Sequence, residues 1–303
     1  MLKKFLSGVF VLIFLLSFSA FIFSFSLSSV ALDPGFYAAS FERHGIYTLV
    51  RDGLAEHSGV PGLAFVAKDA IFPKSWVKES IDGVVSELLS YLKSERESFE
   101  GKISLVPVKS NILSLLVTQS GMADSVDLSS IPDSVSLSEQ AGMDVRSLET
   151  ARRYVSAFLT AVYVAGFFTL LMLAFLVFLW RESLKSVLKA VGSALAFAGI
   201  SAAAVSFVAR SEAPELLANY VSSAAQGMPG IGAAVSGVAT DLISAVFSNV
   251  LVISAIVAVA GMLLLVASFF VSVGNNAKKA GAMEKPEMEN KVSQKNVQGK
   301  EDN

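Results

Sequence analysis

Four apolar runs without a charged residue constrain this chain more than any other feature of its sequence. They are Phe5–Val30, Val155–Trp180, Ala190–Ala209 and Val250–Val273. At a rise of about 1.5 Å per residue, a helix over any of these runs would extend about 30 Å or more, enough to cross the hydrocarbon core of a bilayer. The sequence therefore predicts a mainly α-helical, polytopic membrane protein with four transmembrane helices.

The composition agrees with this prediction and excludes several classes of function. Only 17% of the 303 residues are charged, whereas an ordinary soluble domain has about 25%. The net charge of −2 gives no reason to expect a nucleic-acid partner. Cysteine is absent and histidine occurs twice, at His44 and His57, so disulfides and thiolate or histidine-rich metal centres are excluded. We expect no cofactor and no metal, and an ordinary interfacial or capping role for each histidine.

The first apolar run has two interpretations. A basic start and a small-x-small sequence ending at Ala31 are typical of a signal peptide cleaved after that residue. However, a signal peptide's apolar region is usually about 7–15 residues long, and this run is longer. It also has a helical stripe of phenylalanines at positions 10, 14, 18, 21 and 25. We therefore predict that the segment stays as an uncleaved signal anchor.

Orientation follows from the basic residues near the ends of the spans. A cytoplasmic N-terminus places seven of them inside and three outside, in keeping with the positive-inside rule. The inner ones are Lys3, Lys4, Arg181, Lys185, Lys189, Lys278 and Lys279, and the outer ones are Arg152, Arg153 and Arg210. The sequence thus predicts a multi-pass protein of the cell membrane with both termini in the cytoplasm.

The predicted domain organisation follows from these spans. Its segments are 1–31, transmembrane helix 1; 32–154, an extracytoplasmic domain; 155–180, transmembrane helix 2; 181–189, a cytoplasmic turn; 190–209, transmembrane helix 3; 210–249, an extracytoplasmic loop with an amphipathic helix; 250–273, transmembrane helix 4; and 274–303, a disordered cytoplasmic tail. Gly192 and Ala196, four residues apart in the third span, permit close helix contact.

The region 32–154 is the one part outside the spans that is long enough for its own core, and its patterns are mostly helical. Asp33 and Pro34 predict a helix start, and Gly45 predicts an interruption of that helix. An amphipathic helix is expected within 72–99. The sequence "KISLVPV" predicts a short edge strand, and residues 120–144 read as a long loop. From Asp144 a helix is expected to run directly into the second span.

The segment Met228–Phe247 is nearly free of charge but contains Asp241. A fifth span here would leave two residues for the turn and would place the lysine-containing tail outside. We therefore predict a helix on the outer membrane surface, and a segment that dips into the membrane is the alternative. Its candidate pore or packing residues are Gly227, Gly230, Gly232 and Gly237. The candidate membrane-interface anchors are Arg152, Arg153, Trp180 and Arg181.

The four apolar runs contain no Asp, Glu, Lys, Arg or His. Ion-coupled transporters and intramembrane enzymes generally need such groups within the membrane. We therefore expect no enzyme. The hypothesis is an integral membrane protein whose extracytoplasmic domain is a binding or assembly module, within an oligomer or a larger membrane complex. Besides the lipid bilayer, its partner would be another copy or another membrane protein. The alternative is an oligomeric passive pore, and a membrane enzyme or ion-coupled transporter ranks below both.

Overall fold

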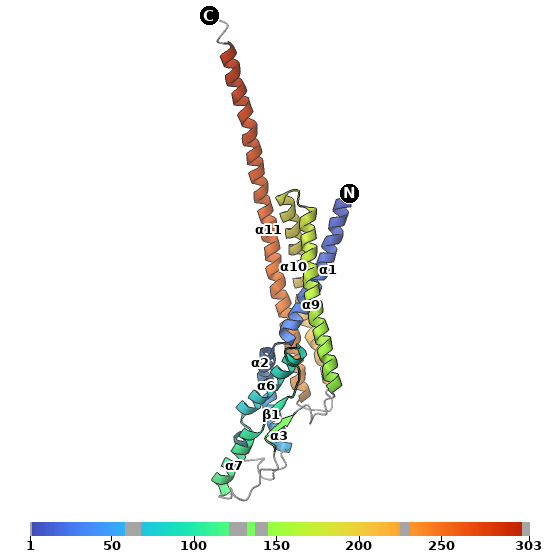
Figure 1. The fold of residues 1–303 in the computed structure, drawn as a ribbon, viewed down its shortest axis with the longest axis vertical. Helices are drawn as coiled ribbons and strands as arrows, with labels where there is room; N and C mark the ends of the chain where they lie inside the picture. Colours follow the sequence, from blue (N-terminus) through green and yellow to red (C-terminus); the bar gives the residue numbers. More distant parts are fainter. Residues whose placement is uncertain (1, 58–67, 121–131, 137–144, 225–230, 299–303) are drawn as a thin grey trace. The chain divides into compact units, whose positions relative to one another are not determined.

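The computed structural model describes residues 2–57, 68–120, 132–136, 145–224 and 231–298. Within these ranges, the side chains of residues 2–4, 57, 68, 116–120, 145, 214–224, 231 and 272–298 are not described. The described residues are mainly helical (Figure 1), as the sequence predicts. The chain divides into two compact units. We call residues 1–22, 165–205 and 250–303 the bundle unit, and residues 23–164 and 206–249 the domain unit.

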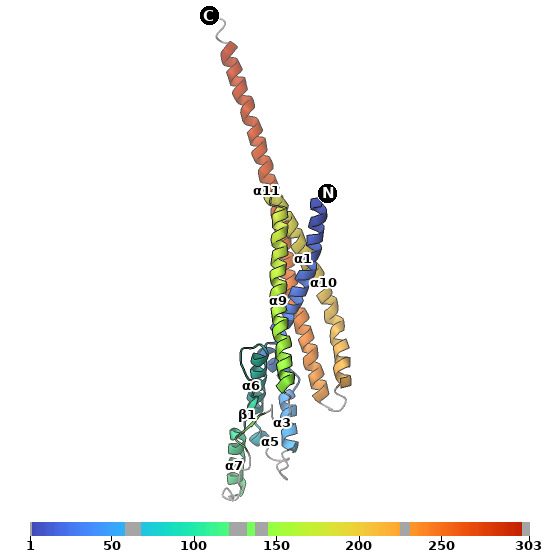
Figure 2. The ribbon, with the colours of Figure 1, turned by 45° about the vertical axis from the view of Figure 1, so that its right-hand side comes forward.

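Four helices are long and apolar enough to cross a membrane, which confirms the predicted number of spans. They are α1 (Leu2–Ala31), α9 (Val145–Leu179), α10 (Leu184–Ala224) and α11 (Ile231–Gln298). The turn at residues 180–183 returns the chain, so that α10 runs antiparallel to α9 (Figures 1 and 2). The helix that begins near Asp144 does run directly into the second span.

Three boundaries differ from the prediction. The turn predicted at 181–189 is shorter, because α10 already begins at Leu184. The region 210–249, predicted as a loop with an amphipathic helix, is helical at 210–224 and 231–249, and residues 231–249 continue directly into the fourth span within α11. The tail predicted to be disordered continues α11 as far as Gln298. Extending an existing helix costs far less than nucleating one, and Ala, Met, Glu, Lys and Gln all favour helix.

The bundle unit has a core of apolar side chains from all four long helices. Its buried members are Phe14, Phe18, Ile22, Met172, Leu176, Ala194, Ala198 and Val250. The phenylalanine stripe contributes to this core: Phe14 and Phe18 are buried, and Phe10 stacks on Phe175 with ring centroids 5.3 Å apart. Phe25, the last member of the stripe, is 45% exposed.

Helices α10 and α11 approach so closely in the bundle unit that glycine is required. A Cβ atom on Gly261 would lie 2.3 Å from the backbone nitrogen of Ala196, and one on Gly199 would lie 2.5 Å from the backbone oxygen of Ser254. A Cβ on Gly192 would lie 2.9 Å from the backbone oxygen of Gly261. Small residues let helix backbones pack this closely in membranes. Gly192 and Ala196, whose spacing permits close contact, thus lie at a tight crossing.

The domain unit contains the region between the first two spans, with helices α2 (Pro34–Arg43), α3 (Ile46–His57), α5 (Lys68–Ile71), α6 (Lys74–Leu92) and α7 (Val106–Ser120). Asp33 caps α2 by accepting a hydrogen bond from the Gly35 nitrogen at 3.0 Å, as predicted. Gly45 separates α2 from α3 with a φ of +66°, which glycine adopts without strain. Helix α6 packs against both α2 and α3.

Two short strands complete the domain unit. Strand β1 (Lys102–Ser104) pairs antiparallel with β2 (Ser134–Ser136), and Ile103 lies opposite Val135. The predicted strand over "KISLVPV" is therefore shorter than expected, because Pro107 lies in the first turn of α7, where its missing N–H has no cost. Strand β2 lies in the segment expected to be a loop. Most of that segment, at 121–131 and 137–144, lies outside the described residues.

Candidate functional site

Asp241 of α11 is the centre of a polar cluster in the domain unit. Its Oδ2 atom accepts a hydrogen bond from the Ser40 hydroxyl at 2.8 Å and from Arg43 Nη1 at 2.6 Å, and it lies 3.0 Å from His44 Nε2. All three partners belong to the last two turns of α2 or to its C-cap. We call Ser40, Arg43, His44 and Asp241 the Asp241 cluster. It joins α2 to the N-terminal part of the fourth span helix.

The local structure explains why His44 reaches Asp241. His44 is the C-cap residue of α2, and the left-handed conformation of Gly45 ends the helix immediately after it. Its imidazole lies against Gly237, where an added Cβ atom would come within 2.4 Å of the ring. Gly237 therefore provides the space for His44, and Asp241 lies one helical turn further along the same face of α11.

A second network fixes α2 and α3 on α6. Lys74 binds Glu42 at 2.6 Å, and Lys78 lies 3.6 Å from both Glu42 and Asp82. The hydroxyl of Tyr47, whose side chain is fully buried, donates to Asp82. The hydrogen bond from Lys74 is the main cause of a lowered pKa of the Glu42 carboxyl. Burial, followed by the hydrogen bond to Asp82, raises the pKa of Tyr47 above its ordinary value.

Tyr47 should make the domain unit sensitive to alkaline pH. Because its folded pKa lies above the ordinary value of 10.0, its stabilising contribution is constant below pH 10 and decreases as the pH rises further. Burial raises the pKa of Tyr37 and adds to the same trend.

We expect Tyr47→Phe to lower the free energy of unfolding by about 1 kcal/mol at pH 8, because its hydrogen bond is lost. It should also weaken the fall of the thermal midpoint between pH 10 and 11. Tyr163→Phe, at a side chain that is 76% exposed, is the control that should keep the full decrease; an equal decrease in both variants would contradict this role.

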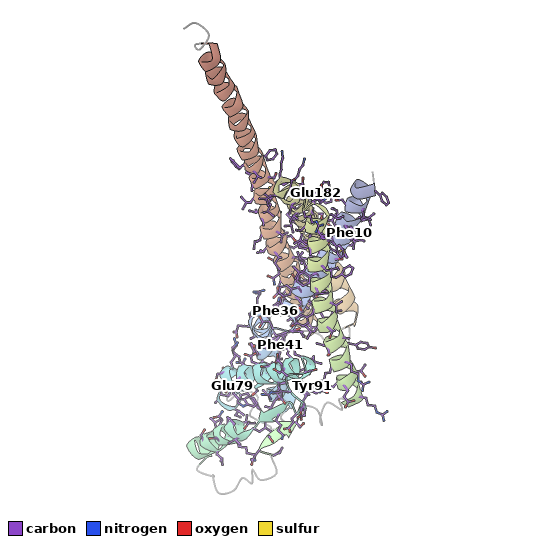
Figure 3. The ribbon with its side chains drawn as sticks, turned by 45° about the horizontal axis from the view of Figure 1, so that its top comes forward. Phe10, Phe36, Phe41, Glu79, Tyr91 and Glu182 are labelled. Carbon is purple, nitrogen blue, oxygen red and sulfur yellow. The ribbon has the colours of Figure 1, made fainter. Side chains whose placement is uncertain are left out.

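The domain unit also contains a cleft of about 590 Å³ between the C-terminal end of α6 and the N-terminal part of α9. Arg152 forms one wall: its Nε donates to the Ser94 hydroxyl at 3.1 Å, and its guanidinium lies 4.9 Å from the centre of the Tyr91 ring. Tyr91, at the C-terminal end of α6, is labelled in Figure 3. The other lining residues are mostly polar: Glu97, Glu149, Arg153, Ser156, Ala157 and Thr160. We call this the Arg152 cleft.

The predicted site residues therefore lie in different places. Arg152 and Arg153 line the Arg152 cleft. In the bundle unit, the Trp180 indole donates to the Ser7 hydroxyl at 3.2 Å, and the Arg181 guanidinium lies 4.5 Å from the centre of the Phe178 ring. Gly237 lies under His44 and Gly232 is buried. The other two predicted glycines, Gly227 and Gly230, lie outside the described residues.

The chemistry that these sites can perform is polar recognition. In the Asp241 cluster, one carboxylate oxygen is shared by a hydroxyl, a guanidinium and an imidazole, an arrangement that holds two helices together. Among the described residues, no three His, Cys, Asp or Glu side chains lie close enough together to hold a metal ion. The Arg152 cleft instead has both cationic and anionic side chains on its walls, which suits a polar or peptide-like partner.

Sequence reasoning missed the Asp241 cluster because its members are about 200 residues apart. The signals were present but separate: a carboxylate in an otherwise apolar segment, and Arg43 and His44 at the end of a predicted helix. An acidic residue in such a segment generally has a cationic partner, and this rule could have suggested the pairing. No known protein-family model matches the chain, and no curated protein or solved structure is significantly similar to it.

Proposed function

We propose that this integral membrane protein uses the region between its first two spans as an extracytoplasmic binding or assembly module. The observation that carries the proposal is the Arg152 cleft, a polar cavity of about 590 Å³ whose walls come from that region and from the start of the second span helix. A partner bound there would contact both. The cleft therefore suits a second copy of the chain or another membrane protein.

The Asp241 cluster supports the same role. It ties α2 of the region to α11, just as Arg152 ties the end of α6 to α9. These contacts hold α2 and the end of α6 against the parts of α11 and α9 that belong to the domain unit. Rigid presentation lowers the entropy that binding costs. The basic residues near the spans, seven against three, support a cell-membrane location with both termini cytoplasmic and this region outside.

A passive pore is the rival function. The described core of the bundle unit is filled by side chains such as Phe14, Ile22 and Leu176, so a pore would have to form among several copies. Reconstitution into liposomes separates the two functions. The binding-module proposal predicts no solute flux above that of empty vesicles.

The proposal is tested by placing a photo-crosslinking amino acid at Ala157, which lines the cleft. In mild detergent, the full-length protein should have a mass above that of a monomer by light scattering, and position 157 should form an adduct with a second copy or a defined membrane partner. Tyr163 of the same helix, 76% exposed, is the matched position that should form no such adduct. A monomeric mass with no adduct specific to position 157 would overturn the proposal.

A further inference from the structure

A second cavity lies in the bundle unit, at the end where α9 and α10 are joined. It has a volume of about 480 Å³, and its lining residues come from the start of α1, from the turn after α9 and from the start of α10. Figure 3 shows Glu182 in the connecting turn and Phe10 of α1 at this same end. The lining includes Ser7, Val11, Trp180, Lys185, Lys189 and Ser193. We call it the Trp180 pocket.

One wall of the Trp180 pocket is cationic. Lys185 and Lys189 are one helical turn apart, so their side chains share a face of α10. Residues 180–189 carry three cations, Arg181 and these two lysines, and a single carboxylate, Glu182. Of the described residues that line the pocket, none is acidic. The pocket therefore attracts an anion.

The Trp180 pocket also has apolar lining residues beside these lysines. The indole N–H of Trp180 donates to the Ser7 hydroxyl at 3.2 Å, which links the turn after α9 to the start of α1. Val11 and Ala190 add aliphatic surface beside it. Tryptophan at the end of a span is typical of the membrane–water interface, where one side of the ring meets acyl chains. A ligand of this pocket would carry a negative head and an apolar body.

We propose that the Trp180 pocket binds the phosphate group of an anionic phospholipid. Basic pockets between membrane helices are suited to phosphate-bearing headgroups. Free inorganic phosphate shares the charge, but it would leave the apolar lining residues Val11, Trp180 and Ala190 without a partner. The location, beside the ends of two spans, also places the pocket at the depth of the headgroups. This inference depends on the four spans and is independent of the partner proposed for the Arg152 cleft.

The test uses the two tryptophans of the chain, Trp76 and Trp180. In a Trp76→Phe background, the fluorescence of the full-length protein reports on Trp180 alone. The protein is reconstituted into phosphatidylcholine vesicles in which one lipid in about ten carries brominated acyl chains, which quench nearby indoles. Brominated phosphatidylglycerol should quench Trp180 much more than brominated phosphatidylcholine at the same fraction. Equal quenching by the two lipids would overturn the proposal.

Lysine variants test whether the preference for phosphatidylglycerol arises in the Trp180 pocket. Near an anionic membrane surface each lysine contributes about a fivefold factor in binding, so the Lys185→Gln/Lys189→Gln double variant should reduce the preference for phosphatidylglycerol by up to about 30-fold. Lys185→Arg/Lys189→Arg should retain it. Lys278→Gln/Lys279→Gln removes two charges elsewhere and should also retain it; an equal loss in this variant would overturn the assignment to the pocket. Added inorganic phosphate at constant ionic strength should change nothing, and competition by phosphate would overturn the lipid as its source.

Discussion

Replacing Gly261 by alanine is expected to destabilise the protein, whereas the same change at Gly8 should stabilise it. In an unobstructed helix, alanine is favoured over glycine by about 1 kcal/mol. Gly8 of α1 has no atom within 4 Å of an added Cβ. At Gly261 that Cβ would lie 2.3 Å from the backbone nitrogen and 2.8 Å from the Cα of Ala196. Backbone atoms within a packed helix cannot rotate away, so α10 and α11 would have to separate.

The expected loss for Gly261→Ala is about 1–3 kcal/mol, the usual cost of overpacking. Since the two variants make the same chemical change within span helices, the difference in sign isolates the helix crossing. The measurement is unfolding by a denaturing detergent, followed by circular dichroism, for both variants beside the unmodified protein. Equal or increased stability of Gly261→Ala would show that the two helices do not pack as described.

Replacing Asp241 by alanine is expected to release α2 from α11. The change leaves the Ser40 hydroxyl, Arg43 and His44 without their shared acceptor. A hydrogen bond to a charged group contributes about 1.5–3 kcal/mol. The Arg43 side chain is 64% exposed, so its ion pair adds little. We expect a loss of about 2 kcal/mol, with faster amide hydrogen exchange over residues 34–47.

Two further variants make the test of the Asp241 cluster specific. Asp69→Ala removes the carboxylate of the ion pair with Arg51. Because the Asp69 side chain is 83% exposed, we expect this variant to lower the free energy of unfolding by less than about 1 kcal/mol. Gly237→Ala keeps every charge but places a methyl group within 2.4 Å of the His44 ring; it should speed exchange over the same segment as Asp241→Ala does. If Asp241→Ala were no more damaging than Asp69→Ala, the cluster would have no role in holding α2.

Local patterns predicted most of the helical elements because each depends on residues close in sequence. Length and lack of charge identified the four spans, while Asp33 and Gly45 marked the two ends of α2. The end of α10 and the start of α11 were harder to predict from the sequence. Residues 231–249 contain both small and polar side chains and read equally well as a separate surface helix, but the structure joins them to the fourth span.

The candidate sites were less predictable because they depend on contacts between distant segments. The Arg152 cleft forms only because the end of α6 lies beside α9, and the Asp241 cluster forms only because α2 lies beside α11. Neither pairing leaves a periodic signal in the sequence. The anchors Arg152 and Trp180 could be named from their positions at the ends of a span, but their partners Tyr91 and Ser7 could not.

The central claim, a four-span protein with its folded region outside and both termini in the cytoplasm, is tested most directly by cysteine accessibility. The chain has no cysteine, so a single introduced thiol gives an unambiguous signal. Ser98→Cys lies at an exposed position of the region between the first two spans, and Ser293→Cys lies in the C-terminal tail. In intact cells, a membrane-impermeant maleimide should label position 98, and should label position 293 only after permeabilisation. Labelling of position 293 in intact cells, with position 98 protected, would contradict the account.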